Sequence, residues 1–286
     1  MAGAKVAYAI NHWPVAIASH SANHPGVRHF CARIDHVDIR QMRDVTLLLA
    51  SPECTSHSLA RGNREPDEQS RATAFEVLRF ADLVRPPFLV VENVVEFTRW
   101  ALYPIWRAGL ETLGYHLREE VLNAADFGAP TTRTRLFVVG AQGMDPPKVE
   151  PPTNVRRVSA REVIDIEAWP FTPVAEKAPR TRERVAAIRR KVGDKPFLLT
   201  YYGSGGYQTL DRPLRTVTAR DRFALVVPGP RGPQMRMLQP PELARGMGFP
   251  DSYVLEGSRQ DKVRQLGNAV SPPVMEGIVS SLQAVA

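Results

Sequence analysis

The chain has 286 residues, of which 43% are hydrophobic, and its formal net charge is +7 at neutral pH. This composition predicts one large domain, or a large and a small one, and argues against wholesale disorder. Two cysteines are too few for a disulfide scaffold or a four-cysteine zinc site, and no metal site is expected. No apolar run reaches ~18 residues and no signal-peptide core is present, so a cytoplasmic protein is expected.

Strand and helix signals alternate in the first half of the chain. Mixed segments with helical spacing predict helices over 12–23 and 65–86, and each stops at a proline. This alternation indicates an α/β fold with a doubly wound, mostly parallel sheet, in which VTLLLA is typical of a strand covered on both faces. Apolar runs predict the strands KVAYAI (5–10), VTLLLA (45–50), FLVVENV (88–94) and RLFVVGA (135–141).

The character of the chain changes near residue 142, where four prolines between 146 and 152 mark a linker. Beyond it, FLLTYY (197–202) and FALVV (223–227) predict short strands. The segments 242–249 and 274–286 read as helices that return to the first domain. A large α/β domain is therefore expected over 1–145 plus 236–286, with a smaller, irregular region over 146–235.

Arginine and lysine crowd residues 156–231. For the stretch RERVAAIRRK alone, a solvated helix face is the simpler explanation. The excess continues through the whole segment, which favours contact with phosphates and therefore a nucleic-acid partner.

One cysteine stands among small polar residues in SPECTSHS (51–58), directly after a predicted strand. A lone cysteine is usually buried filler. Cys54, however, lies in a polar loop at the carboxyl end of its strand, where ligands of parallel sheets bind. A thiol there becomes a nucleophile if a nearby cation or helix N-terminus lowers its pKa. His57 reads as a turn residue.

Polar side chains also mark two further predicted strands. Glu92 and Asn93 end the strand 88–94, and a buried carboxylate there requires a helix N-cap, an ion pair or a ligand. Arg133 and Arg135 alternate into the strand 135–141, so both are expected to point to one face. They would lower the pKa of a thiolate or hold a phosphate there, and surface ion pairs are the alternative.

Several short motifs occur in one order: SPEC, ENV, RTR, the basic region, RPLRTVTA (212–219), GFPDSY (248–253) and QLGNAVSPPV (265–274). Together they resemble the DNA (cytosine-5)-methyltransferases over nearly the whole chain, from about residue 5 onward. The resemblance implies a Rossmann-like methyltransferase domain and a small target-recognition region over 146–235. It also implies double-stranded DNA as substrate, bound between the two parts, and S-adenosyl-L-methionine as methyl donor.

The resemblance assigns roles to the residues of these motifs. The target cytosine is flipped out of the duplex, and Cys54 attacks its C6 atom. Glu92 contacts the N3 and amino edge, and Arg135, with Arg133 alongside, holds the carbonyl of the base or the surroundings of the thiolate. The expected cofactor-binding residues are Asn11, Trp13, Asp38, Ile39, Pro52, Asn268, Ala269 and Val270. The expected DNA-binding residues are Ser56, Arg182, Tyr201, Tyr202, Arg215, Thr218 and Arg220.

The sequence departs from the family pattern in several places. Glu53 and Thr55 flank the cysteine where Pro-Cys-Gln is usual, Thr131 replaces a glutamine, and Asn11 stands where an acid often binds the cofactor ribose. A glycine-rich loop of the form F-x-G-x-G, expected before KVAYAI, is not found. Its strand would be central in a doubly wound sheet, so its loss leaves two strands with unpaired edges.

Three accounts of the missing loop remain open. The recorded start lies downstream of the real one, or a second polypeptide or self-association completes the sheet. In the third account S-adenosylmethionine binding has been lost, and the Cys54 adduct serves another cytosine modification, with another one-carbon donor or by deamination. A non-catalytic DNA-binding homologue is the remaining alternative.

Overall fold

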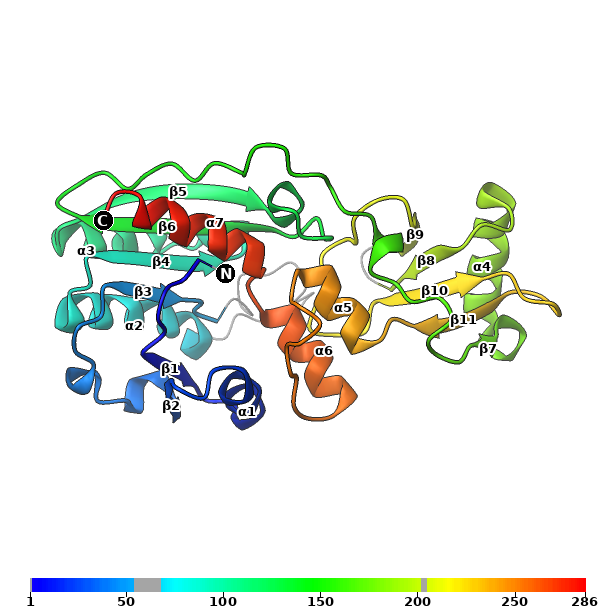
Figure 1. Ribbon diagram of the computed structural model, residues 1–286, viewed down its shortest axis with the longest axis horizontal. Helices are drawn as coiled ribbons and strands as arrows, with labels where there is room; N and C mark the ends of the chain where they lie inside the picture. Colours follow the sequence, from blue (N-terminus) through cyan, green and yellow to red (C-terminus); the bar gives the residue numbers. More distant parts are fainter. Residues whose placement is uncertain (1, 54–67, 202–204) are drawn as a thin grey trace. The chain divides into compact units, whose positions relative to one another are not determined.

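The computed structural model describes residues 2–53, 68–201 and 205–286, and side chains from Thr73 onward in the second range (Figure 1). The chain forms two compact units, each built from separate segments. Unit 1 comprises Met1–Asn123, Thr134–Thr153 and Val274–Ala286, and unit 2 comprises Ala124–Arg133 and Asn154–Pro273. Residues 236–273 therefore pack with the basic region, whereas the sequence suggested that they return to the first domain.

Unit 1 contains most of the elements that the sequence predicts. Its strands are β1 (Tyr8–Asn11), β2 (Arg28–Cys31), β3 (Leu47–Ala50), β4 (Phe88–Asn93), β5 (Tyr115–Asn123) and β6 (Thr134–Gln142). Its helices are α1 (Pro14–Asn23), α2 (Glu68–Val84), α3 (Tyr103–Thr112) and most of α7 (Pro272–Gln283). None of the helices in the described ranges could cross a membrane, since each is too short or too polar.

The larger sheet of unit 1 is mixed, which corrects the expectation of a mostly parallel sheet. Its strand order is β3-β4-β6-β5. Strands β3 and β4 run parallel, whereas β6 is antiparallel to both β4 and β5. Only residues 124–133 join β5 to β6, and a short connection between neighbouring strands requires an antiparallel pair. The apolar run 135–141 identified the strand but contained no information about its direction.

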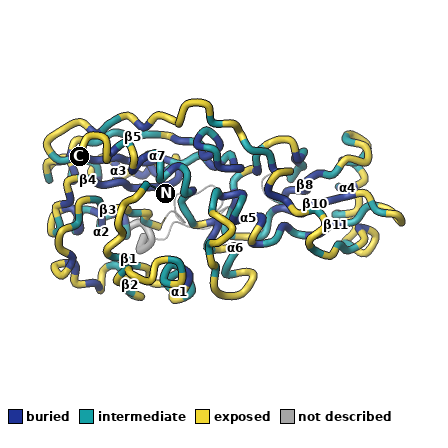
Figure 2. The backbone as a smooth tube through the Cα atoms, viewed as in Figure 1, coloured by how far each residue is buried: buried dark blue, intermediate teal, exposed yellow. Residues whose placement is uncertain are grey.

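Strands β1 and β2 form a separate parallel pair, and β3 lies at the edge of the four-stranded sheet. Leu49 of β3 is 45% exposed, whereas Leu89, Val90 and Val91 of β4 are completely buried (Figure 2). The expectation that VTLLLA is covered on both faces is therefore wrong for the described structure. An edge position explains the difference, because β3 has a hydrogen-bonded strand on one side only.

One face of the mixed sheet is covered by α2 and α3. Alternate apolar residues of β4 and β6, Leu89 and Val91 on one strand and Leu136 and Val138 on the other, form a core with these helices. The indole Nε1 of Trp106 donates to the carbonyl of Ala74 at 2.8 Å and ties α3 to α2. This packing fixes β4, and with it the residues at its carboxyl end.

Unit 2 is built around an antiparallel sheet with the strand order β7-β11-β10-β8-β9. Its strands are β7 (Thr172–Pro173), β8 (Phe197–Thr200), β9 (Gly206–Thr209), β10 (Phe223–Val227) and β11 (Gln234–Met237). Its helices are α4 (Pro179–Val192), α5 (Pro240–Met247) and α6 (Arg259–Asn268).

Both faces of β8 and β10 are buried. Phe197 and Leu199 pack with α4, whereas Leu198 and Leu225 pack with α5 and α6. The helix expected over 242–249 is confirmed as α5, but its apolar face belongs to the core of unit 2.

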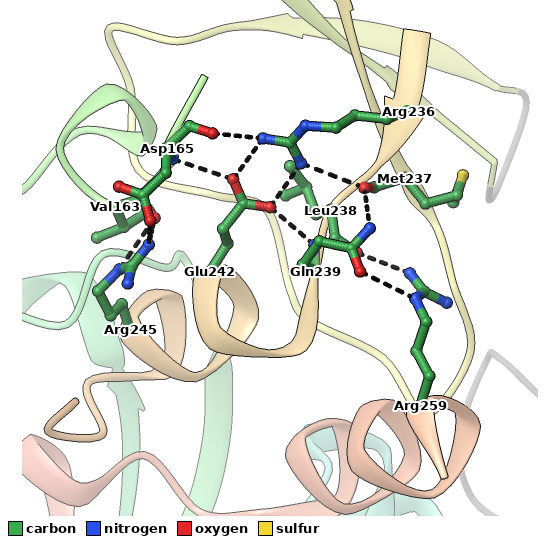
Figure 3. A network of polar contacts seen from close by, with 9 residues as sticks. All are labelled: Val163, Asp165, Arg236, Met237, Leu238, Gln239, Glu242, Arg245 and Arg259. Carbon is green, nitrogen blue, oxygen red and sulfur yellow. Dashed lines mark hydrogen bonds and ion pairs between the residues drawn. The ribbon is translucent and has the colours of Figure 1, made fainter. Parts of the chain in front are cut away.

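A buried ion pair joins β11 to α5 (Figure 3). The carboxylate of Glu242 accepts from both terminal nitrogens of Arg236 at 2.7 and 2.8 Å, and neither side chain is more than 4% exposed. It also accepts from the backbone N–H groups of Asp165 and Gln239, at 3.0 and 2.7 Å. Arg236 lies 5.2 Å from the ring centre of Trp169 and donates to the carbonyl of Asp165. Each of the two charged groups is therefore stabilised by its partner in the ion pair and by further neighbouring groups.

Three histidines, His20, His24 and His29, lie close together where α1 approaches β2. Their contact is expected to weaken at acid pH. His20 Nδ1 lies 2.7 Å from His29 Nε2. Burial, followed by the nearby His24 and His29, lowers the pKa of His20 from its ordinary 6.5 to about 4. The unfolded chain therefore binds an extra proton between these values, and the stability from neutral His20 is lost as the pH falls from 6.5 toward 4. In denaturant titrations, His20→Gln should flatten this pH dependence, whereas His12→Gln, at an exposed position, should leave it unchanged. A wild-type and a His20→Gln profile of equal slope would contradict the expectation.

Candidate functional site

Glu92 and Arg135 form an ion pair at the carboxyl end of β4. The Nε atom of Arg135 lies 3.2 Å from Oε1 of Glu92, and the side chains are 17% and 8% exposed. Glu92 pairs with Phe137 in the antiparallel register, so Arg135 is its diagonal neighbour on the same face. A carboxylate this deeply buried remains charged only with a cation beside it. The pair therefore places a compensated negative charge at the strand end.

Asn93 connects this strand end to the segment that precedes Cys54. Its Nδ2 donates to the carbonyl of Pro52 at 3.3 Å, and its Oδ1 accepts from the N–H of Val94 at 2.8 Å. The N–H of Glu53 donates to Oγ1 of Thr73 in α2. Cys54 and Ser56 lie outside the described residues. The residues just before Cys54 are thus held by the strand that carries Glu92 and by α2.

Arg133 makes a different contact from Arg135. It precedes β6 by one residue, is 4% exposed, and donates from Nη1 to the carbonyl of Val217 at 3.0 Å. Arg133 lies in the loop before β6, whereas Arg135 lies in the strand. That both guanidinium groups point to one face stays a prediction.

The contact of Arg133 belongs to a larger attachment of the segment Leu214–Arg220, here called the strap. The N–H of Leu214 donates to the carbonyl of Pro130 at 2.8 Å, and its carbonyl accepts from the N–H of Thr132 at 2.7 Å. Oγ1 of Thr131 donates to the carbonyl of Arg215 at 3.2 Å. The hydroxyl of Thr218 donates to the carbonyl of Arg220. Three of the expected DNA-binding residues, Arg215, Thr218 and Arg220, therefore lie on one fixed segment.

The other expected DNA-binding residues that the structure describes are Arg182 and Tyr201. Arg182 is exposed on α4, and Tyr201 follows β8, whereas Tyr202 lies outside the described residues. The guanidinium of Arg184 is 5.4 Å from the ring centre of Tyr201. Arg222 donates to the carbonyl of Tyr201 at 2.7 Å. These two arginines were not singled out from the sequence, because a uniformly basic segment does not reveal which of its cations contact a neighbour.

The residues expected to hold the cofactor occur in both units. In unit 1, Asn11 ends β1 and its Oδ1 accepts from the N–H of Trp13, which precedes α1. The carboxylate of Asp38 is exposed and accepts from the N–H of Arg40. Ile39 is buried in the core beside Phe80, so its side chain is not available to a ligand. Pro52 follows β3 and is half-buried.

The remaining expected cofactor residues, Asn268, Ala269 and Val270, follow one another at the end of α6 in unit 2. Asn268 is exposed, and the N–H of Ala269 continues the helical bonding to Gln265. In the part of the chain that the structure describes, no group of three or more His, Cys, Asp or Glu side chains could hold a metal ion.

Known proteins resemble the chain over its whole length. Residues 1–284 match the family model described as C-5 cytosine-specific DNA methylase. Type II methyltransferase M.NlaX of Neisseria lactamica is 28% identical, over 94% of this chain and 85% of its own length. M.MthTI of Methanothermobacter thermautotrophicus is 25% identical over 99% and 91%. Among solved structures, the Dnmt2 methyltransferase of S. pombe has a TM-score of 0.68 at 19% identity, covering 99% of this chain and 92% of its own.

Proposed function

Since the chain belongs to the C-5 cytosine-specific DNA methylases, we propose that it methylates C5 of a cytosine in double-stranded DNA through Cys54, Glu92 and Arg135. The observation that carries this assignment is the buried Glu92–Arg135 pair beside the segment that leads to Cys54. A charged carboxylate and a cation at one strand end provide both an acceptor and a donor for the polar edge of a base.

In the proposed reaction, Sγ of Cys54 forms a bond to C6 of a cytosine that has left the base stack. Sγ reacts as a thiolate, and N3 takes up a proton from water as the Sγ–C6 bond forms. Glu92 accepts hydrogen bonds from the N3 and amino edge and stabilises the positive charge that this edge carries once C5 has received its methyl group. Arg135 pairs with Glu92 and donates to the carbonyl of the base. Water then takes the C5 proton, the electron pair of the C5–H bond restores the C5–C6 double bond, Sγ leaves C6 as a thiolate, and N3 returns its proton to water.

S-adenosylmethionine, when bound, supplies the methyl group. The donor set of unit 1 fits its nucleoside part. The side-chain N–H groups of Asn11 can donate to ribose hydroxyls, since only its Oδ1 is used by Trp13. Asp38 offers an exposed carboxylate to an adenine amino group, and the indole of Trp13 offers a face for stacking. Ile39 would contribute through its backbone. Asn268, Ala269 and Val270 of unit 2 are the other residues proposed to bind the cofactor.

DNA binding is assigned to the exposed cations of unit 2. Arg182, Arg215 and Arg220 are exposed, Thr218 lies on the strap between the last two, and Tyr201 contacts a further arginine, Arg184. Arginines in such positions bind phosphates without reading the sequence of bases. The comparisons give no support to another cytosine modification or to a non-catalytic homologue. The first test therefore measures methyl transfer to duplex DNA.

The proposal is tested by incubating the purified chain with duplex DNA and S-adenosylmethionine carrying a labelled methyl group. We expect labelled 5-methylcytosine among the nucleosides after digestion of the DNA. Heat-denatured protein is the control. The DNA should contain many different sequences, and the incubation should be long. If only unlabelled cytosine is then found, the result contradicts the proposal.

The neutral isostere Glu92→Gln should lower the rate of methyl transfer by about 10²–10³-fold, because the developing charge on the base then meets an uncharged amide. Arg135 would also lose its partner at 3.2 Å. Glu111→Gln is the matched control, since Glu111 forms an exposed ion pair with Arg107 on α3. Single-turnover rates measure both variants. A Glu92→Gln rate within a few-fold of the wild type would remove Glu92 from the mechanism.

A further inference from the structure

Gly267, in the last turn of α6, lies directly against the main chain of the strap. A Cβ atom at this position would overlap the carbonyl carbon of Thr218 and the N and Cα atoms of Ala219. All three are backbone atoms, so no side chain can rotate to make room. Glycine is therefore the residue that allows the helix and the strap to approach this closely.

Hydrogen bonds to residues 130–133 limit how far the strap can move away from α6. Leu214 exchanges two backbone hydrogen bonds with Pro130 and Thr132. Arg133 and Thr131 donate side-chain hydrogen bonds to the carbonyls of Val217 and Arg215. Leu214 and Val217 are also buried in the core of unit 2. An added methyl group at Gly267 must consequently displace the strap or the end of the helix.

The strap carries two arginines whose guanidinium groups take no part in its attachment. Arg215 and Arg220 are exposed, and their guanidinium groups make no hydrogen bond or ion pair with the described residues. Arg245 and Arg259 of the neighbouring helices differ, because each is paired with an aspartate. Within the described residues, Arg215 and Arg220 are therefore available for an external anion, and their positions depend on the backbone of the strap.

We propose that Gly267 is a positioning residue: it seats the strap on α6 and so sets the place of Arg215 and Arg220 relative to the DNA backbone. This inference rests on the proposed function, because that function makes DNA the ligand. Gly267 also precedes Asn268 in the chain, so the same contact links the strap to the residues assigned to the cofactor. A shift of about 1 Å in such a support is sufficient to cost a large factor in binding or rate.

The test compares Gly267→Ala with Gly246→Ala by fluorescence anisotropy, using a labelled DNA duplex of mixed sequence without cofactor. Gly246 of α5 also faces the strap, but its added Cβ would meet only a side-chain end, Cδ1 of Leu214 at 2.6 Å. We expect Gly267→Ala to raise the Kd roughly tenfold and Gly246→Ala to change it by about twofold at most. Hydrogen exchange of residues 215–220 should accelerate in Gly267→Ala only. Where methyl transfer is measurable, the KM for DNA should rise while kcat changes little.

Thermal unfolding separates loss of folding from loss of positioning. If Gly267→Ala does not fold, Thr131→Val decides, because it removes only the side-chain hydrogen bond to the carbonyl of Arg215 in the strap. A Kd raised about threefold is then expected. Unchanged affinity in a folded Gly267→Ala, or in Thr131→Val if the first does not fold, overturns the inference, as does absence of DNA binding by the wild type. Binding without methyl transfer would contradict the proposed reaction and leave the strap inference standing.

Discussion

A Cys54→Ser variant is expected to form no covalent complex with DNA that contains 5-fluorocytosine, whereas the wild type should form one in the presence of S-adenosylmethionine. Fluorine at C5 cannot leave as a proton does, so the bond between Sγ and C6 persists after methyl transfer. Denaturing electrophoresis detects the complex as a band of reduced mobility. On ordinary DNA, the loss of the nucleophile should lower methyl transfer by on the order of 10⁴-fold or more.

The size of this effect follows from the difference between a thiol and a hydroxyl. A few per cent of a free thiol is ionised at neutral pH, and a nearby cation increases that share, whereas a serine hydroxyl without a base is hardly ionised. Serine also places its oxygen closer to the main chain than the sulfur would be. The role of Arg135 is consistent with this requirement, since its guanidinium pairs with Glu92 at the carboxyl end of β4, the strand next to β3.

Cys31→Ser is the matched control, because Cys31 is the only other cysteine in the sequence and is exposed on β2. It should form the covalent complex at the wild-type rate. A complex formed by Cys54→Ser but lost in Cys31→Ser would reverse the assignment. A complex in neither the wild type nor Cys31→Ser, on DNA that the protein is known to methylate, would rule out covalent attack.

Arg236→Met should destabilise unit 2 by about 3–5 kcal/mol, because it leaves the buried carboxylate of Glu242 without its cation. Two backbone N–H groups still donate to that carboxylate, from Asp165 and Gln239, but they do not neutralise it. Chemical denaturation, together with hydrogen exchange at the amides of β10 next to Arg236, measures the loss.

Two further variants make this prediction specific. The double variant Arg236→Met, Glu242→Leu removes both charges and should recover much of the stability, since a buried ion pair is often replaceable by apolar groups of similar volume. Arg156→Met breaks an exposed pair with Glu162 and should change the free energy of unfolding far less than Arg236→Met does, because solvent screens the exposed charges. If Arg236→Met is no more destabilising than Arg156→Met, the buried pair contributes little.

The sequence predicted the elements of unit 1 where burial is uniform along a segment. β4 and β6 were identified because their central residues, FLVV and LFVVGA, are apolar, and these are largely buried in the structure. β5 was missed, because its residues YHLREEVLN mix buried, half-buried and exposed positions and carry charges. Strand direction was also missed, since apolar patterning is the same in parallel and antiparallel pairs.

The candidate site was predictable in its residue types and less so in its contacts. Glu92 at the end of an apolar strand required an ion pair or a ligand, and the structure gives it Arg135. The hydrogen bond from Arg133 to the carbonyl of Val217 could not be predicted, because the two residues are 84 positions apart in the chain. The role of Gly267 could not be predicted from the sequence. It depends on close contact with Ala219, which lies 48 positions earlier in the chain and meets Gly267 only in the folded protein. The roles assigned to Cys54 and to the cofactor and DNA residues remain predictions.

The division of the chain into interrupted units has a consequence for its synthesis. The helix residues Val274, Ile278, Val279 and Leu282 are buried, yet they follow the whole of unit 2 in the chain. A ribosome that adds about 5–20 residues per second needs roughly 6–24 s to proceed from residue 153 to residue 274. During that interval the apolar surface that α7 later covers is open to water and to chaperones. Unit 1 is therefore the first unit whose synthesis begins and the last whose synthesis is completed.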